Sequence, residues 1–294
     1  MYGVELFYEA LPEISGGDLL AALRRRSADI APLGAERGEP PWVFEHTEHR
    51  LPASLGGGNV RCLVGLSTHA PDLQALEAAL SQSWTWPQAA DALGRCRASV
   101  LVTDLMSDGL HHLERLVLFE NVLVAVLQAY PCLAIHWQPT QQIVHPREFL
   151  TAVEEAGGLV FTPGPLNVRL FRFFGPQPTT PASAPALAAS EERATGDVLM
   201  DTLGLTALGL TDLQCHFTGL DPQAVARVLF NTGIYLMERG PVIEDGHTVP
   251  GIGADEKWPC HRKPSFALPD RIVIDLDPGA PFSARDRRSA ADRI

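Results

Sequence analysis

The sequence predicts an α+β fold in which mixed sheets are flanked by helices. Between residues 59 and 174, short apolar runs rich in Val and Leu alternate with segments of helical periodicity. This order indicates an α/β arrangement and leaves antiparallel strand pairs open. The composition agrees, because 46% of the 294 residues are hydrophobic and 20% are charged, which allows one or two domains with a sizeable core.

The first part of the chain holds most of the expected elements. Its strands are β-prone or continuously apolar runs, as positions in a buried sheet require. Its helices carry apolar residues at spacings of three and four, and the last of them starts at a proline and ends at a glycine. Strands are expected at residues 3–10, 40–51, 59–67, 98–106, 132–139 and 168–175. Helices are expected at residues 15–26, 70–84, 86–96, 110–130 and 145–158.

The pattern changes after residue 174. Residues 175–196 are rich in Pro, Ala, Ser and Thr and predict a linker or a surface loop. A β-prone stretch follows at 197–217, and residues 221–240 predict a helix that begins with Asp-Pro and ends at a glycine. A last strand is expected at 271–279. The expected division is an α/β body, a linker or loop, and a C-terminal α+β region that pairs into the same sheet system, at residues 1–174, 175–196 and 197–294.

The charge of the chain argues against several classes of partner. The formal net charge is −12, and a negative surface repels phosphate backbones and anionic lipid, so we expect no nucleic acid and no membrane as partner. The excess is local: residues 197–256 hold nine Asp or Glu and two Arg, a net of −7. Residues 257–294 hold five acidic and eight basic side chains, a net of +3. A basic protein partner fits this bias.

Several features predict a cytoplasmic protein without metal or cofactor. The five cysteines are scattered and include no C-x-x-C pair, which predicts neither a disulfide framework nor a zinc site. Residues 1–13 lack the cationic and then apolar order of a signal peptide. The apolar segment 110–130 is interrupted by charged and amide side chains, so we expect a buried helix and not a membrane span.

The stretch with the most candidate chemistry is GIYLMERGPVIEDGHTVPG, residues 233–251. Its Asp-Gly pair between apolar runs predicts a hairpin turn in which both residues have φ > 0, with Glu244 and His247 facing each other across the turn. The alternative is a set of binding or catalytic groups carried on a loop. We favour the turn, and expect the polar groups around it to contact a partner. The candidate partner-binding residues are Glu238, Glu244, Asp245, His247, Asp255 and Glu256.

Other polar motifs give little indication of catalysis. His46 and His49 could share a metal ion on a helix, but on the strand expected at 40–51 they point to opposite faces, and no third ligand is identifiable. Cys260 and His261 are neighbours in a proline-broken stretch that we expect to be exposed, and sequence neighbours seldom reach one reacting atom. No phosphate-binding loop, dinucleotide fingerprint or hydrolase motif occurs. We therefore expect no catalytic, cofactor or metal residues.

Residues 200–251 resemble a bacterial family, domain of unknown function 4261. The resemblance consists of a Thr-x-Gly start, an acidic-then-polar strand, a helix ending in a tyrosine-containing turn, and an Asp-Gly-x-Thr sequence. The matching residues are Thr202, Gly204, Leu208, Gly209, Asp212, Tyr235, Gly240, Asp245, Gly246 and Thr248. The middle of the chain resembles the upstream portion of longer members, which extends the likeness from about residue 59 to residue 277. The resemblance implies a mixed α and β fold and no established catalytic residue.

The expected function is that of a non-catalytic protein-binding protein. We expect an immunity or accessory protein that sequesters a basic bacterial toxin or effector through an acidic surface, in the manner of toxin–antitoxin pairs. The alternative is a hydrolase or transferase whose dispersed groups, His69, His136, Asp245 and His247, converge in the fold. A third possibility is a structural or adaptor component that forms homo-oligomers. The sequence leaves the partner's identity and the oligomeric state open.

Overall fold

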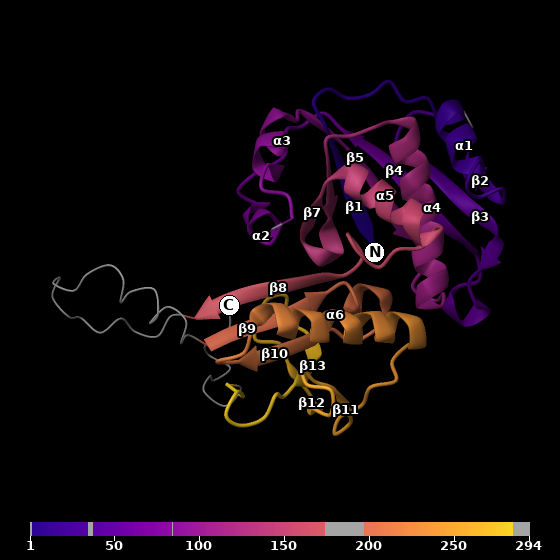
Figure 1. Ribbon diagram of the computed structural model, residues 1–294. Coiled ribbons are helices and arrows are strands. Elements are labelled where there is room, and N and C mark those ends of the chain that lie inside the picture. The colour runs from indigo at the N-terminus through magenta and orange to yellow at the C-terminus, as the bar shows by residue number, and fades with distance from the viewer. Residues whose placement is uncertain (1, 35–37, 84, 174–196, 285–294) are drawn as a thin grey trace, which may run out of the picture. The chain divides into compact units, whose positions relative to one another are not determined.

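The computed structural model describes residues 2–34, 38–83, 85–173 and 197–284 (Figure 1). The chain folds into two units: Met1–Asn167 with Ala207–Gly209, and Val168–Thr206 with Leu210–Ile294. The first unit ends before residue 174, the expected end of the first body, because the strand at this point joins the sheet of the second unit. The linker or loop expected at residues 175–196 lies outside the described residues.

The first unit is built on a seven-stranded sheet with the order β2-β3-β4-β5-β1-β6-β7. Its strand pairs are all antiparallel, so the α+β class is confirmed with the open alternative of antiparallel pairing realised. The strands are β1 (Gly3–Tyr8), β2 (Ile30–Pro32), β3 (Trp42–Arg50), β4 (Asn59–Ser67), β5 (Ala98–Leu105), β6 (Ala134–Trp137) and β7 (Gln142–Val144).

Helices cover both faces of this sheet (Figure 1). They are α1 (Gly16–Arg24), α2 (Glu77–Ser81), α3 (Ala89–Arg95), α4 (His112–Ala129) and α5 (Pro146–Ala156). On one face the ring of Tyr2 contacts Phe119 of α4, with 5.0 Å between centroids. On the other face Phe7 packs with Leu76 and Leu93, beside α2 and within α3. Tyr2 and Phe7 lie on opposite faces because successive side chains along an extended chain point in opposite directions.

The helix expected from residue 70 begins only at Glu77. Leu73, which belongs to the expected apolar stripe, is 40% exposed, and residues 73–76 form turns. The spacing of leucines therefore identified the helical segment but not its start. No helix within the described ranges is both long enough and apolar enough to span a bilayer.

Helix α4 carries a buried carboxyl group, that of Glu120, on the side that faces the core. Glu120 is 1% exposed, and its Oε2 accepts a hydrogen bond from the Val160 N–H at 3.1 Å. Its Oε1 has no hydrogen-bond partner in the described part of the chain. Burial raises the pKa of Glu120 well above its usual value of 4.5, and the Val160 bond only partly opposes this shift. Burial therefore favours the protonated form of this side chain to higher pH than in an exposed glutamate.

The second unit contains a six-stranded sheet of its own, with the order β11-β12-β13-β10-β9-β8. β10 and β13 are parallel, whereas β9–β10, β11–β12 and β12–β13 are antiparallel, so this sheet is mixed. The strands are β8 (Asn167–Phe173), β9 (Asp197–Leu203), β10 (Leu213–Phe217), β11 (Thr248–Pro250), β12 (Lys257–Pro264) and β13 (Ile272–Leu276).

The strand β12 corrects one expectation. The stretch around Cys260 was expected to be irregular and exposed, yet it is a continuous strand in which Trp258 and Cys260 are fully buried. The prolines Pro259 and Pro264 are exposed and stand at positions where the strand loses no essential hydrogen bond. Alternation of buried and exposed residues thus overrides the disruptive effect that prolines usually have in a strand.

The helix of the second unit, α6 (Pro222–Arg239), packs against β9 and β10. Its start is fixed by Asp221, whose carboxylate accepts the N–H groups of Gln223 at 3.1 Å and Ala224 at 3.3 Å. Its end is Gly240, which has φ +81°. The helix expected at residues 221–240 is therefore confirmed, including both of its terminal signals.

One face of this second sheet carries buried charges. Arg169 binds both carboxylate oxygens of Asp201, at 2.9 and 2.6 Å. Arg271 binds Asp201 at 2.8 Å through Nη2 and Asp212 at 3.0 Å through Nε. Asp212 also accepts the Leu205 N–H at 3.1 Å. Buried carboxylates are tolerated only when they are paired and hydrogen-bonded, and these contacts meet that condition.

Replacing Glu120 by Gln should stabilise the first unit, and more so as the pH rises. The folded-state pKa of Glu120 is raised, so its contribution to stability is full below the unfolded pKa of about 4.5 and is lost progressively above it. Gln does not ionise and escapes this loss. Urea unfolding at pH 5 and pH 8 checks the prediction, with the exposed Glu154→Gln as control. An equal effect of Glu120→Gln at both pH values would contradict it.

Replacing Arg271 by Ala should destabilise the second unit by about 3–5 kcal/mol, because Asp212 would remain buried without its arginine. The exposed Arg262 gives a matched control: its contact is made by the backbone N–H, so Arg262→Ala should change stability by less than about 0.5 kcal/mol. Denaturant unfolding followed by tryptophan fluorescence distinguishes the two. A loss of stability in Arg271→Ala as small as that in Arg262→Ala would show that the buried pair is not required.

Candidate functional site

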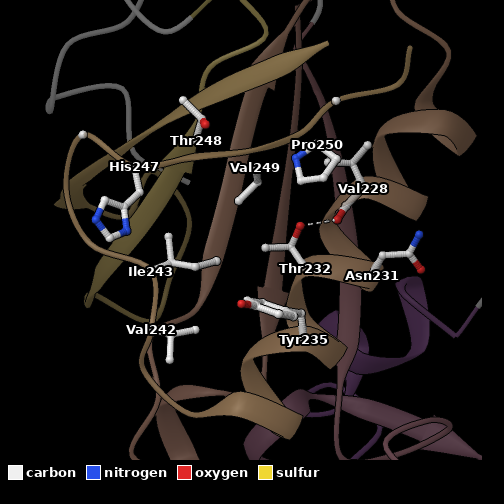
Figure 2. Close-up of a pocket in the computed structure, with 12 residues that line it drawn as sticks. Val228, Asn231, Thr232, Tyr235, Val242, Ile243, His247, Thr248, Val249 and Pro250 are labelled. Atoms are coloured by element: carbon white, nitrogen blue, oxygen red, sulfur yellow. Dashed lines mark hydrogen bonds between the residues drawn. The ribbon is translucent and has the colours of Figure 1, made fainter. Parts of the chain in front are cut away.

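A groove of about 800 Å³ lies in the second unit between α6 and residues 242–251 (Figure 2). Both walls are largely apolar. Figure 2 shows the side chains of Thr232 and Tyr235 on the helix facing Ile243 and Val249 across the groove. Tyr235 is 48% exposed and Val242 is 44% exposed, so the groove presents large apolar groups to solvent. Exposed apolar surface collected in a concavity is typical of a binding site.

The helix wall follows from the sequence of α6. Val228, Thr232 and Tyr235 are spaced by four and three residues, which places them on one stripe of the helix. The Thr232 hydroxyl donates a hydrogen bond to the Val228 carbonyl at 2.7 Å and is thereby satisfied within the helix (Figure 2). The wall therefore offers apolar contact, with the Tyr235 hydroxyl as its polar tip.

The opposite wall begins with a turn at residues 244–247, and here the expected turn type is wrong. Gly246 has φ +82°, but Asp245 is not among the residues with positive φ. With the His247 N–H bonded to the Glu244 carbonyl at 3.2 Å, this is the geometry of a type II turn. The reason is that the segment before the turn is not a strand. Gly246 and His247 instead pair with Cys260, through two hydrogen bonds of 2.8 Å.

The hairpin of this region follows the turn, between β11 and β12. Glu256 closes it: its Oε2 accepts the N–H groups of Ile252 and Gly253 at 2.9 Å each, and its Oε1 accepts the Trp258 indole N–H at 2.8 Å. These hydrogen bonds, led by that of Gly253, lower the pKa of Glu256 below its usual value. A Cβ atom on Gly251 would lie 2.5 Å from Trp258 Nε1, so the loop requires a glycine there.

The six candidate partner-binding residues divide into two groups. Asp245 and Glu256 have conformational roles, since Asp245 Oδ1 accepts the Arg262 N–H at 2.7 Å and Glu256 closes the hairpin. The others have exposed side chains: Glu238, Glu244, His247 and Asp255. Of these four, only His247 is among the groove's lining residues.

Among these exposed residues, the structure brings Glu244 and His247 together. Their side chains are 3.9 Å apart, as expected, and the His247 Nδ1 accepts the Glu244 N–H at 3.2 Å. His247 also lines the groove. Glu238 lies one helical turn beyond Tyr235, and Asp255 lies in the loop of the hairpin. The three acidic residues are thus neighbours of lining residues in the sequence and are not themselves part of the lining.

The groups of the hydrolase alternative do not form a site within either unit. In the first unit, His69 follows β4 and His136 lies in β6, three strands away in the sheet, which is roughly 14 Å at 4.7–4.9 Å per strand. Burial lowers the pKa of His136 to about 4. In the second unit, the Asp245 carboxylate is occupied by a backbone N–H. His247 alone of the four lines the groove.

The expectation that His46 and His49 point to opposite faces is wrong. The pairing of β3 with β4 shifts register between His46 and Arg50, and this irregularity brings the two rings to a centroid distance of 6.0 Å. Both approach Asp29 Oδ2, at 3.6 and 4.0 Å. Even so, the described residues contain no group of three His, Cys, Asp or Glu side chains that could hold a metal ion.

The cysteines are not set up for nucleophilic chemistry. Cys260 and His261 occupy successive positions of β12, so their side chains point to opposite faces. Burial raises the pKa of the Cys260 thiol to about 11, and those of Cys62 and Cys132 to about 12. Thiols in such surroundings stay protonated and unreactive. All five cysteines of the chain are free.

The apolar groove wall is what sequence reasoning missed. The expected site consisted of charged residues, whereas the groove is formed by Val228, Tyr235, Val242 and Ile243. A signal existed: α6 carries further apolar residues, Val228 and Tyr235, beside the stripe that contacts the sheet. A helix that packs on only one side needs one apolar stripe, and additional apolar residues indicate a further contact.

Residues 201–277 match the model of a family described as "Domain of unknown function (DUF4261)". The match confirms the resemblance seen in residues 200–251, and residues 59–200 of the expected likeness lie outside it. No curated protein and no solved structure matches the chain. The matched range contains both walls of the groove, the hairpin and the aspartates paired with Arg271. The groove is thus a feature of a DUF4261 domain that occupies residues 201–277 of this chain.

Proposed function

We propose that this chain is a non-catalytic cytoplasmic binding protein whose second unit sequesters a basic protein partner, of the toxin or effector class. The observation that carries the proposal is the groove beside α6, which exposes Tyr235 and Val242, with the exposed Glu238 and Glu244 close to them in the sequence. Exposed aromatic and aliphatic groups supply affinity when a partner covers them. Acidic groups around them attract a basic partner and select against acidic ones.

The charge distribution supports a basic partner. Residues 197–256 contain the groove and have a net charge of −7 from nine acidic and two basic side chains. Two of the nine, Asp201 and Asp212, are buried and paired with arginines outside this range, so the exposed carboxylates are the ones available to a partner. Glu244 has a side chain that is 77% exposed and makes only a long contact of 3.9 Å with His247. An exposed carboxylate of this kind loses little solvation until a partner arrives, and can then form a new ion pair.

The roles of the other polar groups also favour binding over catalysis. Asp245 and Glu256, the acidic residues most firmly held near the groove, accept backbone N–H groups with their carboxylates. A general acid or base needs a carboxylate that can reach a substrate and has a pKa near the working pH. Hydrogen bonding lowers the pKa of Glu256 and so moves it away from that range.

Affinity capture from the native host tests the proposal. The immobilised full chain should retain a basic protein in stoichiometric amount at low salt and less of it at high salt. Recovery of no stoichiometric partner at either salt concentration would refute the proposed function. Retention of an acidic protein that is insensitive to salt would refute the role of charge.

Reversing the charge at Glu238 and Glu244 should slow association with the captured partner by roughly tenfold and reduce its salt dependence. Both side chains are exposed, so the melting temperature should stay unchanged. Surface plasmon resonance of the Glu238→Lys/Glu244→Lys variant measures the rate. Glu154→Lys, an equally exposed site on α5 of the first unit, is the matched control. Equal slowing by the control would show a general charge effect.

Replacing Tyr235 by Ala should weaken the complex by about 2–4 kcal/mol, mainly through faster dissociation, because large aromatic anchors dominate binding energies. The side chain is half-exposed, so the loss of folding stability should be small. Val117, which is 38% exposed on α4 of the first unit, provides a control in Val117→Ala. Unchanged dissociation in Tyr235→Ala would remove the groove from the binding surface.

A further inference from the structure

One wall of the groove is an open edge of the second sheet. β11 is the last strand in the order β11-β12-β13-β10-β9-β8, and the described residues place no strand on its other side. Edge strands present unpaired N–H and C=O groups, to which another chain can add as a further strand. β11 also lines the groove with Thr248, Val249 and Pro250.

The hydrogen bonds of β11 show which of its backbone groups face outward. His247 and Gly251 bond to the hairpin partner, at 2.8 Å to Cys260 and 2.9 Å to Glu256. Because bonding alternates along an antiparallel strand, Thr248 between them points its N–H and C=O away from β12. Pro259, which lies opposite Thr248, has no N–H to offer, and its carbonyl accepts the Asp277 N–H at 2.9 Å.

We infer that the groove receives an extended, basic segment of the partner, which adds to β11 as a short strand hydrogen-bonded to Thr248. The inference rests on the function proposed above and specifies how the partner binds. Thr248 supplies one donor and one acceptor, and Pro250 supplies an acceptor only. Strand addition is therefore confined to a few residues, and the groove must supply the remaining affinity.

The groove explains the side-chain pattern expected of this segment. Alternate residues of an added strand point to opposite faces. One set enters the groove on the side of Val249, opposite Thr232 and Tyr235 on α6 (Figure 2), and should be apolar. The other set faces solvent beside the exposed Thr248 and Pro250. Glu244, in the turn before β11, favours Arg or Lys next to Thr248, whereas the exposed Lys257, which is paired with Pro250, disfavours them at that end.

Selection from a random dodecapeptide display library on the immobilised full chain tests this inference. The enriched sequences should alternate apolar with basic residues. The most enriched peptide, synthesised with a fluorescent label, is then titrated against variants by fluorescence anisotropy. Thr248→Pro removes the outward N–H without removing a bond to β12, and should weaken binding roughly 2- to 10-fold, the effect of one hydrogen bond. Thr248→Val keeps the N–H and should bind like the unchanged chain.

A second measurement covers the case in which Thr248→Pro does not fold. The same peptide is N-methylated at one position at a time and titrated against the unchanged chain. Methylation should weaken binding at the position that donates to the Thr248 carbonyl and not at its immediate neighbours. In hydrogen exchange, the Thr248 amide should slow when the peptide is added, because it becomes a donor to the added strand.

The outcomes separate this inference from the function on which it rests. Peptides that need Tyr235 but are indifferent to Thr248→Pro and to N-methylation would overturn strand addition and leave the groove as the binding site. No enrichment of any peptide would also overturn it.

A dimer that Thr248→Pro dissociates would assign the edge to a second copy of this chain. Tighter peptide binding after deletion of residues 285–294 would assign it to that segment, which holds four arginines. Either result excludes a foreign strand as the occupant.

Discussion

The pairing of two buried aspartates with two arginines is the interaction on which the second unit depends. Arg271 stands at the start of β13 and contacts Asp201 in β9 and Asp212 just before β10, so one guanidinium connects three parts of the sheet. Arg169 of β8 binds the same Asp201, so a fourth strand joins this network. Burial raises the pKa of Asp212 and the Arg271 guanidinium opposes that shift. A side chain that pairs with two buried carboxylates and connects several strands constrains everything built on that sheet, including α6 and β11.

The surface of this unit is shaped by carboxylates that serve the backbone. Asp221 starts α6, Asp245 holds the turn against β12, and Glu256 closes the hairpin. Asp221 and Glu256 accept N–H groups that would otherwise be left unpaired at a helix start or in a loop, and Asp245 accepts one from strand β12. Part of the concentrated negative charge is therefore a by-product of loop construction. The rest of the negative charge lies at exposed positions such as Glu238 and Glu244.

The sequence predicted long elements well because their signals are redundant. β4 was expected at residues 59–67 and occupies those residues, and α6 carries a cap, a first-turn proline and a terminal glycine. The sequence-based prediction failed where a local irregularity changes the direction of a side chain or the type of a turn. The register shift in β3 reverses the face of His49 relative to His46. Likewise, the turn at Asp245 depends on pairing with Cys260, which is distant in sequence and invisible to local patterns. The groove itself was missed because apolar helix residues are normally assigned to a core.

The state of the thiols has a practical consequence. All five cysteines are free, and burial raises the pKa of each of them, which suppresses the thiolate that reacts with electrophiles. A single cysteine placed on the exposed surface should therefore react with a maleimide reagent faster than the four buried thiols, and Cys132, which is partly exposed, is the one native thiol to replace beforehand. With Cys132 replaced, the chain accepts one spectroscopic probe at a chosen position.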